Sequence, residues 1–118
     1  MRLLPISNRF REILAAIGRG NCPDICLTIM SEGDEWKRYS DVYYTLVAHI
    51  RLPWATYSKL TKYLIEKGFI ESQTRKDNKR KVILVRLTNK GKELVKMYVE
   101  LQGRKLQELE LKNEPPLK

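Results

Sequence analysis

The fold is decided by residues 53–91, which read PWATYSKLTKYLIEKGFIESQTRKDNKRKVILVRLTNKG. The first part predicts a helix over about 53–67, because proline suits its first position and glycine suits its end. Tyr57, Leu60 and Leu64 recur at the spacing of one buried helical face. The apolar period then shortens from that of a helix to that of a strand, so the stretch joins a helix to a hairpin.

The hairpin is predicted from two runs, 69–73 and 81–87, that read as antiparallel strands. Residues 74–80, TRKDNKR, lie between them and supply turn formers and charge. Alternate side chains of the second strand should point to opposite faces, with Val82, Leu84 and Arg86 on one and Ile83, Val85 and Leu87 on the other.

Upstream, the sequence predicts three helices. Ser7 should cap the first, whose apolar residues Phe10, Ile13, Leu14 and Ile17 follow helical spacing. The second should run from Asp24 to Glu32 and, being apolar almost all round, should lie in the centre of the core. After a polar loop over 33–39, Ser40 should cap a third helix that reaches about Ile50, where Leu52 and Pro53 break the chain.

Thr88 should cap a final helix that runs to about Leu111, roughly 34 Å long at 1.5 Å per residue. A helix of that length would project beyond a body this small, so one apolar stripe should cover the body and another a second copy. The alternative is a monomer whose last helix wraps its own core. The residues expected at the dimer interface are Phe10, Ile13, Ile17, Val95, Tyr98, Val99, Gln102, Leu106 and Leu109.

Together these elements predict an α+β fold, mainly α, formed by one domain over residues 1–118. Its architecture is a winged helix-turn-helix with a long C-terminal dimerisation helix. The helix-turn-helix occupies about 40–67, the wing about 69–87 and the last helix about 88–111. In this motif the second helix enters the major groove of DNA.

The charge distribution favours a nucleic-acid partner. The formal net charge is +9, and residues 51–90 hold eleven Lys or Arg against three Asp or Glu, a net of +8. Cations gathered in one block are expected of a polyanion-binding face, because each one near a phosphate releases condensed counterions. The alternative is that these charges only make the protein surface soluble and bind no polyanion.

The expected DNA contacts come from the outward side of the 53–67 helix and from the hairpin tip. Ser58 and Lys59 should approach base edges, while Lys62 and the hydroxyl of Thr56 should reach phosphates. Trp54 could either stack on a sugar or thymine methyl, or pack against the loop around Trp36. The full set is Trp54, Ala55, Thr56, Ser58, Lys59, Lys62, Tyr63, Arg75, Lys76, Lys79, Arg80 and Lys81.

Two motifs resemble those of the MarR-type winged-helix regulators. Residues 55–71 are similar to that family's recognition helix and its exit into the wing, and Leu87-Thr88-Asn89-Lys90-Gly91 to its Leu-Thr-x-x-Gly approach to the last helix. The similarity covers roughly 43–91 and extends to small archaeal and archaeal-virus regulators. It implies a homodimeric transcription regulator. The family's wing arginine is replaced here by Lys81.

Other classes find little support in the residues. The chain has one histidine, no glycine-rich phosphate loop and no nucleophile beside an evident base, so we expect no enzyme, cofactor or metal site. Cys22 and Cys26 should be two small, semi-buried residues, with a disulfide as the minority alternative. A non-specific DNA-coating protein and a protein-interaction module remain the competing functions, and nothing marks an effector pocket.

The expected location follows from the same reading of the chain. It contains no apolar run long enough to span a membrane and no secretory signal, which predicts the cytoplasm. There it would be associated with the nucleoid or, for a viral protein, lie in the host cytoplasm.

Overall fold

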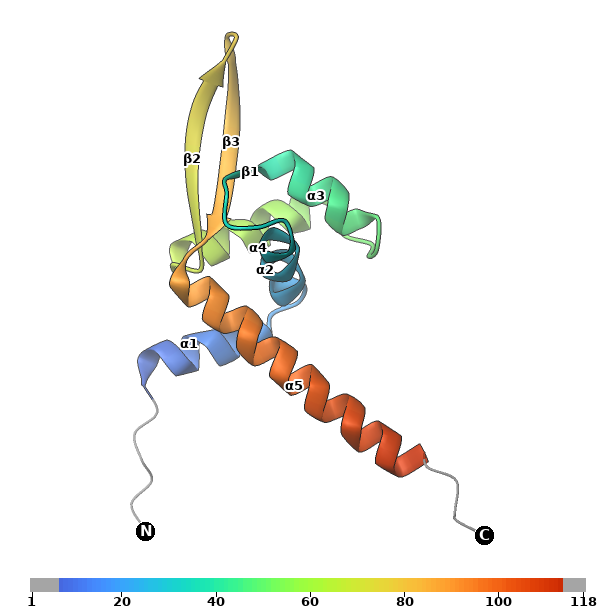
Figure 1. The fold of residues 1–118 in the computed structure, drawn as a ribbon. Helices are drawn as coiled ribbons and strands as arrows, with labels where there is room; N and C mark the ends of the chain where they lie inside the picture. The colour runs from blue at the N-terminus through green and yellow to red at the C-terminus, as the bar shows by residue number, and fades with distance from the viewer. Residues whose placement is uncertain (1–6, 114–118) are drawn as a thin grey trace.

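The computed structural model describes residues 7–113, and in that range the chain is mainly helical with one small antiparallel sheet (Figure 1). The mainly α, α+β class is therefore confirmed. The elements are α1 (Asn8–Ile17), α2 (Cys22–Ser31), β1 (Lys37–Arg38), α3 (Tyr39–Val47), α4 (Trp54–Glu66), β2 (Ile70–Asp77), β3 (Arg80–Leu87) and α5 (Asn89–Asn113).

Helix α2 lies at the centre of the core, as its composition predicts. It contacts α1, α3, α4, α5 and β3. Ile25, Cys26 and Ile29 are fully buried in it. Ser7 caps α1 by accepting a hydrogen bond from the backbone N–H of Phe10, which confirms the predicted cap. Helix α2 begins at Cys22, two residues before the predicted start.

Helix α3 is shorter than predicted and begins two residues earlier. Its N-cap is Arg38, whose extended backbone ends β1, so Ser40 lies inside the helix rather than capping it. The short strand β1 pairs with β3 in a region predicted to be a polar loop. At the other end the helix stops at Val47 instead of about Ile50, and the hydroxyl of Tyr43 donates to the carbonyl of Leu52 in the turn that follows.

The hairpin is longer than predicted. Strands β2 and β3 each contain eight residues, and the segment predicted as a seven-residue loop shrinks to the two-residue turn Asn78-Lys79. Both turn residues have positive φ, 46° and 70°, as a type I′ turn requires. The sheet order is β1-β3-β2. Because β1 covers only the base of β3, the hairpin projects well beyond the body (Figure 1).

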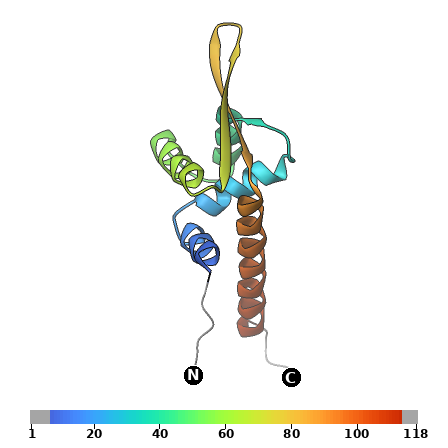
Figure 2. The same ribbon diagram turned by 90° about the vertical axis from the view of Figure 1, so that its left-hand side faces the viewer.

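A close-packed joint connects the hairpin to α5. Thr88 separates β3 from the helix; its hydroxyl donates to the carbonyl of Gly68 and accepts from the backbone N–H of Gly91, which confirms Thr88 as the cap. At Gly91 a Cβ atom would overlap the carbonyl oxygen of Phe69. Helix α5 then runs past α1 to the end of the molecule opposite the hairpin (Figure 2).

Candidate nucleic-acid interface

Helix α4 presents one buried and one exposed side. Tyr57, Leu60 and Leu64 are buried, as predicted, and Thr61 is buried with them. The opposite side leaves the predicted DNA contacts Trp54, Ala55, Thr56, Lys59 and Lys62 exposed, with Ser58 and Tyr63 half-buried at its two flanks. An outward ridge therefore runs along this helix.

Trp54 belongs to an aromatic cluster between α3 and α4. Its ring packs edge-on against Tyr39 and Tyr43, with centroid distances of 5.2 and 4.9 Å. Packing against the loop around Trp36 was one of the two predicted placements, and Trp54 does pack on Tyr39, the last residue of that predicted loop, whereas Trp36 itself lies under the guanidinium of Arg86, at 4.4 Å. The exposed fraction of Trp54 is 47%, so part of its ring remains accessible.

Tyr57 fastens this cluster to the start of α3. Its ring stacks on that of Tyr39 at 4.7 Å, and its hydroxyl donates to the Tyr39 carbonyl at 2.8 Å. The hydroxyl of Tyr39 in turn donates to Oγ of Ser58 at 2.9 Å. Burial, reinforced by the neighbouring Tyr39, raises the pKa of Tyr57 well above its ordinary value. The phenol therefore stays protonated, and the N-terminal half of α4 is held rigidly against α3.

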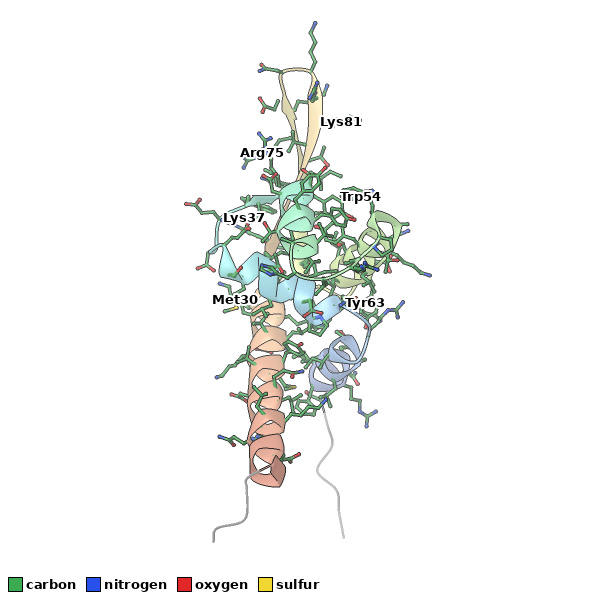
Figure 3. The ribbon with its side chains drawn as sticks, turned by 90° about the vertical axis from the view of Figure 1, so that its right-hand side faces the viewer. Met30, Lys37, Trp54, Tyr63, Arg75 and Lys81 are labelled. Carbon is green, nitrogen blue, oxygen red and sulfur yellow. The ribbon has the colours of Figure 1, made fainter. Side chains whose placement is uncertain are left out.

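The other flank of α4 is covered from the turn between α1 and α2. The guanidinium of Arg19 lies over the ring of Tyr63, 4.1 Å from its centroid. Figure 3 shows Tyr63 on the side of α4 that faces away from the hairpin tip, and Trp54 on the side toward it. Tyr63 thus presents less free surface than its helical position predicted.

A groove of about 640 Å³ separates α4 from the hairpin. Trp54, Ser58 and Lys62 line its helical wall, and Ser72 and Ile83 belong to its sheet wall. The exposed side of α4 and the hairpin are therefore neighbouring surfaces.

The cations of the hairpin are all exposed: Arg75, Lys76, Lys79, Arg80 and Lys81. Among the described residues none of these five cations forms an ion pair. Asp77, the acidic residue that lies among them in the sequence, pairs instead with Arg38 of β1 at 3.6 Å. The pairing register divides them between the two faces. Lys76 lies directly opposite Lys81, on the face shared with Ile83 and the α4 groove, whereas Arg75 and Arg80 lie on the reverse face.

Two residues expected at a dimer interface lie in the chain's own core. Ile13 and Val95 are 2% and 3% exposed, because α1 and α5 pack on each other and on α2. Their assignment to a partner-facing surface is therefore wrong. Phe10, Val99, Gln102 and Leu106 are exposed, Ile17 and Tyr98 are half-buried, and the side chain of Leu109 lies outside the described residues.

Salt bridges join α1 to α5 near that surface. Arg9 binds the carboxylate of Glu93 through two nitrogens, at 2.8 and 2.9 Å. Lys90 pairs with Glu12 and holds the pKa of that carboxyl below its ordinary value, chiefly through their hydrogen bond. These contacts fix the orientation of α1 on the base of α5.

Three residues that pack against α4 were not predicted from the sequence: Tyr39, Tyr43 and Arg19. The spacing of Tyr39 and Tyr43, four residues apart in a helix next to Trp54, could have predicted the aromatic cluster. Nothing local predicted that Arg19 would lie over Tyr63, because 44 positions separate the two residues and only the packed fold brings them together.

Cys22 and Cys26 are free thiols and fully buried, rather than semi-buried. Burial raises the pKa of Cys22 to about 11. Within residues 7–113, no group of His, Cys, Asp or Glu could hold a metal ion, and no helix is long and apolar enough to cross a membrane.

Comparison with known proteins supports the fold. No protein-family model matches the chain, and no curated protein does so. The solved structure of smu.1704 from Streptococcus mutans UA159 is similar with a TM-score of 0.61 at 17% identity, covering 99% of this chain and all (100%) of that one. A protein from Methanosarcina mazei Go1, named as a "possible transcriptional regulator", has a TM-score of 0.54 at 13% identity over 98% of this chain and 97% of its own.

The fold is winged-helix-like. At these identities the similarity concerns the fold alone. It nevertheless spans nearly the whole chain, so the arrangement of helices, sheet and long last helix is one that known proteins share.

Proposed function

We propose that this chain is a MarR-like winged helix-turn-helix regulator of transcription that binds double-stranded DNA sequence-specifically as a homodimer. The observation that carries the proposal is the groove that places the exposed side of α4 next to a hairpin with five unpaired cations. The regulator-like name of the Methanosarcina mazei protein with this fold adds support. The role is non-enzymatic.

In the proposed complex α4 lies in the major groove, which is about 12 Å wide and accepts one helix. Lys59, on the exposed ridge, faces base edges and favours guanine, whose O6 and N7 are acceptors. Ser58 contributes a second contact to the bases. Lys62 and Thr56 bind phosphates on the two sides of that ridge and set the register of the helix.

The hairpin is proposed to act as the wing. Its cations bind phosphates or enter a narrow minor groove, where the negative potential is enhanced. Lys76 and Lys81 are the leading candidates, because they share the face of the α4 groove. Like charges directly opposite each other destabilise a sheet, and a bound phosphate would relieve that repulsion. Lys79 at the tip, and Arg75 and Arg80 on the reverse face, complete the proposed contact set.

The homodimer is proposed to form through α5, with Phe10 and Ile17 of α1 contributing. Val99 and Leu106 are 52% and 59% exposed on α5, which runs beyond α1 to the end of the molecule opposite the hairpin (Figure 2). Exposed apolar side chains on a projecting helix are expected where a partner helix covers them. A two-fold dimer would present two α4 helices to a palindromic site with half-sites about 10 base pairs apart.

Selection of bound fragments from a random DNA pool tests the DNA-binding proposal. The expected result is an enriched palindrome with that spacing. If no sequence is enriched and all fragments bind with equal affinity at fixed salt, the chain is a DNA-coating protein. If no fragment binds at about 100 mM salt, a protein partner is favoured. Lys59→Ala should weaken binding to the enriched site more than binding to random DNA, whereas Lys105→Ala on α5 should change neither.

Sedimentation equilibrium tests the dimer separately. The unaltered chain should have twice the mass of 13.9 kDa. The substitutions Val99→Glu and Leu106→Glu should yield the monomer mass without loss of helical signal, and Lys105→Glu serves as the matched charge control. A monomer mass for the unaltered chain at micromolar concentration would overturn the dimer while leaving DNA binding to be judged by selection.

A further inference from the structure

Arg19 is an exposed cation that sequence reasoning left without a role. It lies in the short turn Gly18-Arg19-Gly20 between α1 and α2, and in the described part of the chain it forms no salt bridge. An exposed arginine would ordinarily sample many rotamers. Here its guanidinium rests on the ring of Tyr63 at 4.1 Å, so its position is tied to α4.

The backbone of the turn is tied to the same helix. Gly20 has a φ of +53°, a conformation that favours glycine, and its Cα faces the methyl groups of Leu60 closely enough for a Cβ to touch them at 3.8 Å. The carbonyl of Arg19 also accepts a hydrogen bond from the backbone N–H of Cys22. The side chain of Arg19 is therefore held against α4, and its main chain is held to the start of α2.

The position of Arg19 complements that of the hairpin. The hairpin and its groove lie along the flank of α4 that carries Trp54 and Ser58. Tyr63 projects from the other flank, on the side of α4 that faces away from the hairpin tip (Figure 3). A helix in the major groove has a phosphate backbone on each side, so a protein that binds there needs cations on both flanks.

We propose that Arg19, backed by the ring of Tyr63, binds a DNA phosphate on the edge of the major groove opposite the hairpin. An arginine suits this task because its planar guanidinium can stack on an aromatic face and still direct several N–H groups at phosphate oxygens. Stacking also restricts the side chain before binding, which lowers the entropy lost on contact. The role assigned to Tyr63 is to position Arg19.

The proposal rests on DNA binding by α4, and its test separates the two. With the enriched duplex, Arg19→Gln should lower the slope of log affinity against log salt by about 0.9 per protomer. Arg104→Gln, an exposed arginine on the projecting half of α5, should leave that slope unchanged. If the unaltered protein binds no DNA, the proposed function fails; if it binds with a slope that Arg19→Gln does not alter, only the assignment of Arg19 fails.

The phosphate can be located with neutral methylphosphonates placed one at a time along the duplex. One position on the groove edge opposite the hairpin should weaken binding by the unaltered protein several-fold and have no effect on Arg19→Gln. Arg19→Lys should retain part of the sensitivity at that position. Equal sensitivity of the unaltered protein and Arg19→Gln at every phosphate would overturn the proposal.

The positioning role of Tyr63 has its own readout. Tyr63→Phe preserves the aromatic face and should keep the methylphosphonate effect at the Arg19 position, whereas Tyr63→Leu should reduce it. Thermal unfolding of both variants shows whether α4 remains folded. A Tyr63→Leu protein that is folded and keeps the full effect would remove Tyr63 from the proposal.

Discussion

Replacing Lys76 and Lys81 with alanine should weaken DNA binding while leaving the protein as stable as before or more so. The two ammonium groups project from directly opposed positions of β2 and β3 on the face of the α4 groove. In the free protein they repel each other, so their removal should not lower the melting temperature. In the complex they should each neutralise a phosphate. The substitution therefore separates a loss of binding from a loss of fold.

The magnitude follows from the number of cations removed. Each phosphate contact contributes about 0.9 to the slope of log affinity against log salt, so two contacts contribute about 1.8 for each hairpin. Between about 50 and about 200 mM salt a slope of that size corresponds to roughly a twelvefold change in affinity. The variant should thus be less sensitive to salt than the unaltered protein by about that factor per hairpin.

Fluorescence anisotropy of a labelled duplex across a salt series gives the slope, and a thermal melt gives stability. The matched control is Arg104→Ala with Lys105→Ala, which removes two exposed cations from α5 on the side of the molecule away from the hairpin. An unchanged slope would refute the assignment of the hairpin to DNA. A reduced slope accompanied by a clearly lower melting temperature would refute the argument that the two lysines repel in the free protein.

Three further predictions concern the fold. Gly91→Ala should lower the free energy of unfolding by about 2 kcal/mol or more, since a Cβ there overlaps a backbone carbonyl, while Gly103→Ala, which has open space around it, should raise it by about 0.5–1 kcal/mol; urea denaturation measures both. Lys79→Gly should also raise the urea midpoint, because glycine adopts positive φ without strain and Lys79 has a φ of 70°. At pH 8 the thiol of Cys22 should be inert to alkylation until the protein unfolds, since burial raises its pKa to about 11; rapid labelling of the native protein would contradict this.

The sequence predicted the elements that have strong local patterns. Helix α4 has a proline before it, a glycine after it and an apolar stripe between, and these three signals agree. The caps of α1 and α5 were also predicted correctly, because Ser7 and Thr88 each have a hydroxyl group at the residue before the helix begins. The hairpin was recognised from its second strand, where the β-branched and apolar run over residues 82–85 follows a stretch of turn formers.

Its length was not predictable from the same signal. The outer half of β2 is exposed and charged, so it has no apolar alternation, and it is held as a strand by backbone pairing with β3. Its turn also lacks the glycine that marks a type I′ turn in a sequence. Register, which divides the cations between two faces, therefore emerged only from the structure.

The remaining differences between the predicted and the observed site arise from contacts between residues far apart in the sequence. Periodicity shows that Ile13 and Val95 are apolar and lie on helix faces, but it does not say which surface covers those faces. Their own chain covers them, which restricts the exposed apolar side chains to others such as Val99 and Leu106. Likewise the stacking of Arg19 on Tyr63 depends on how α1 and α2 return to α4.

The junction at Thr88 should couple the movement of the hairpin to that of α5. Because Gly91 packs directly on the Phe69 backbone, α5 and the sheet should turn together as one stiff lever rather than bend at their junction. A strand of eight residues is about 26 Å long at 3.3 Å per residue. A tilt of α5 by about 10° would then swing the tip sideways by roughly 4–5 Å, slightly more than the rise of about 3.4 Å between successive nucleotides of one strand. Small rearrangements at the far end of α5 would therefore be enough to move the hairpin away from the phosphates that it is proposed to bind.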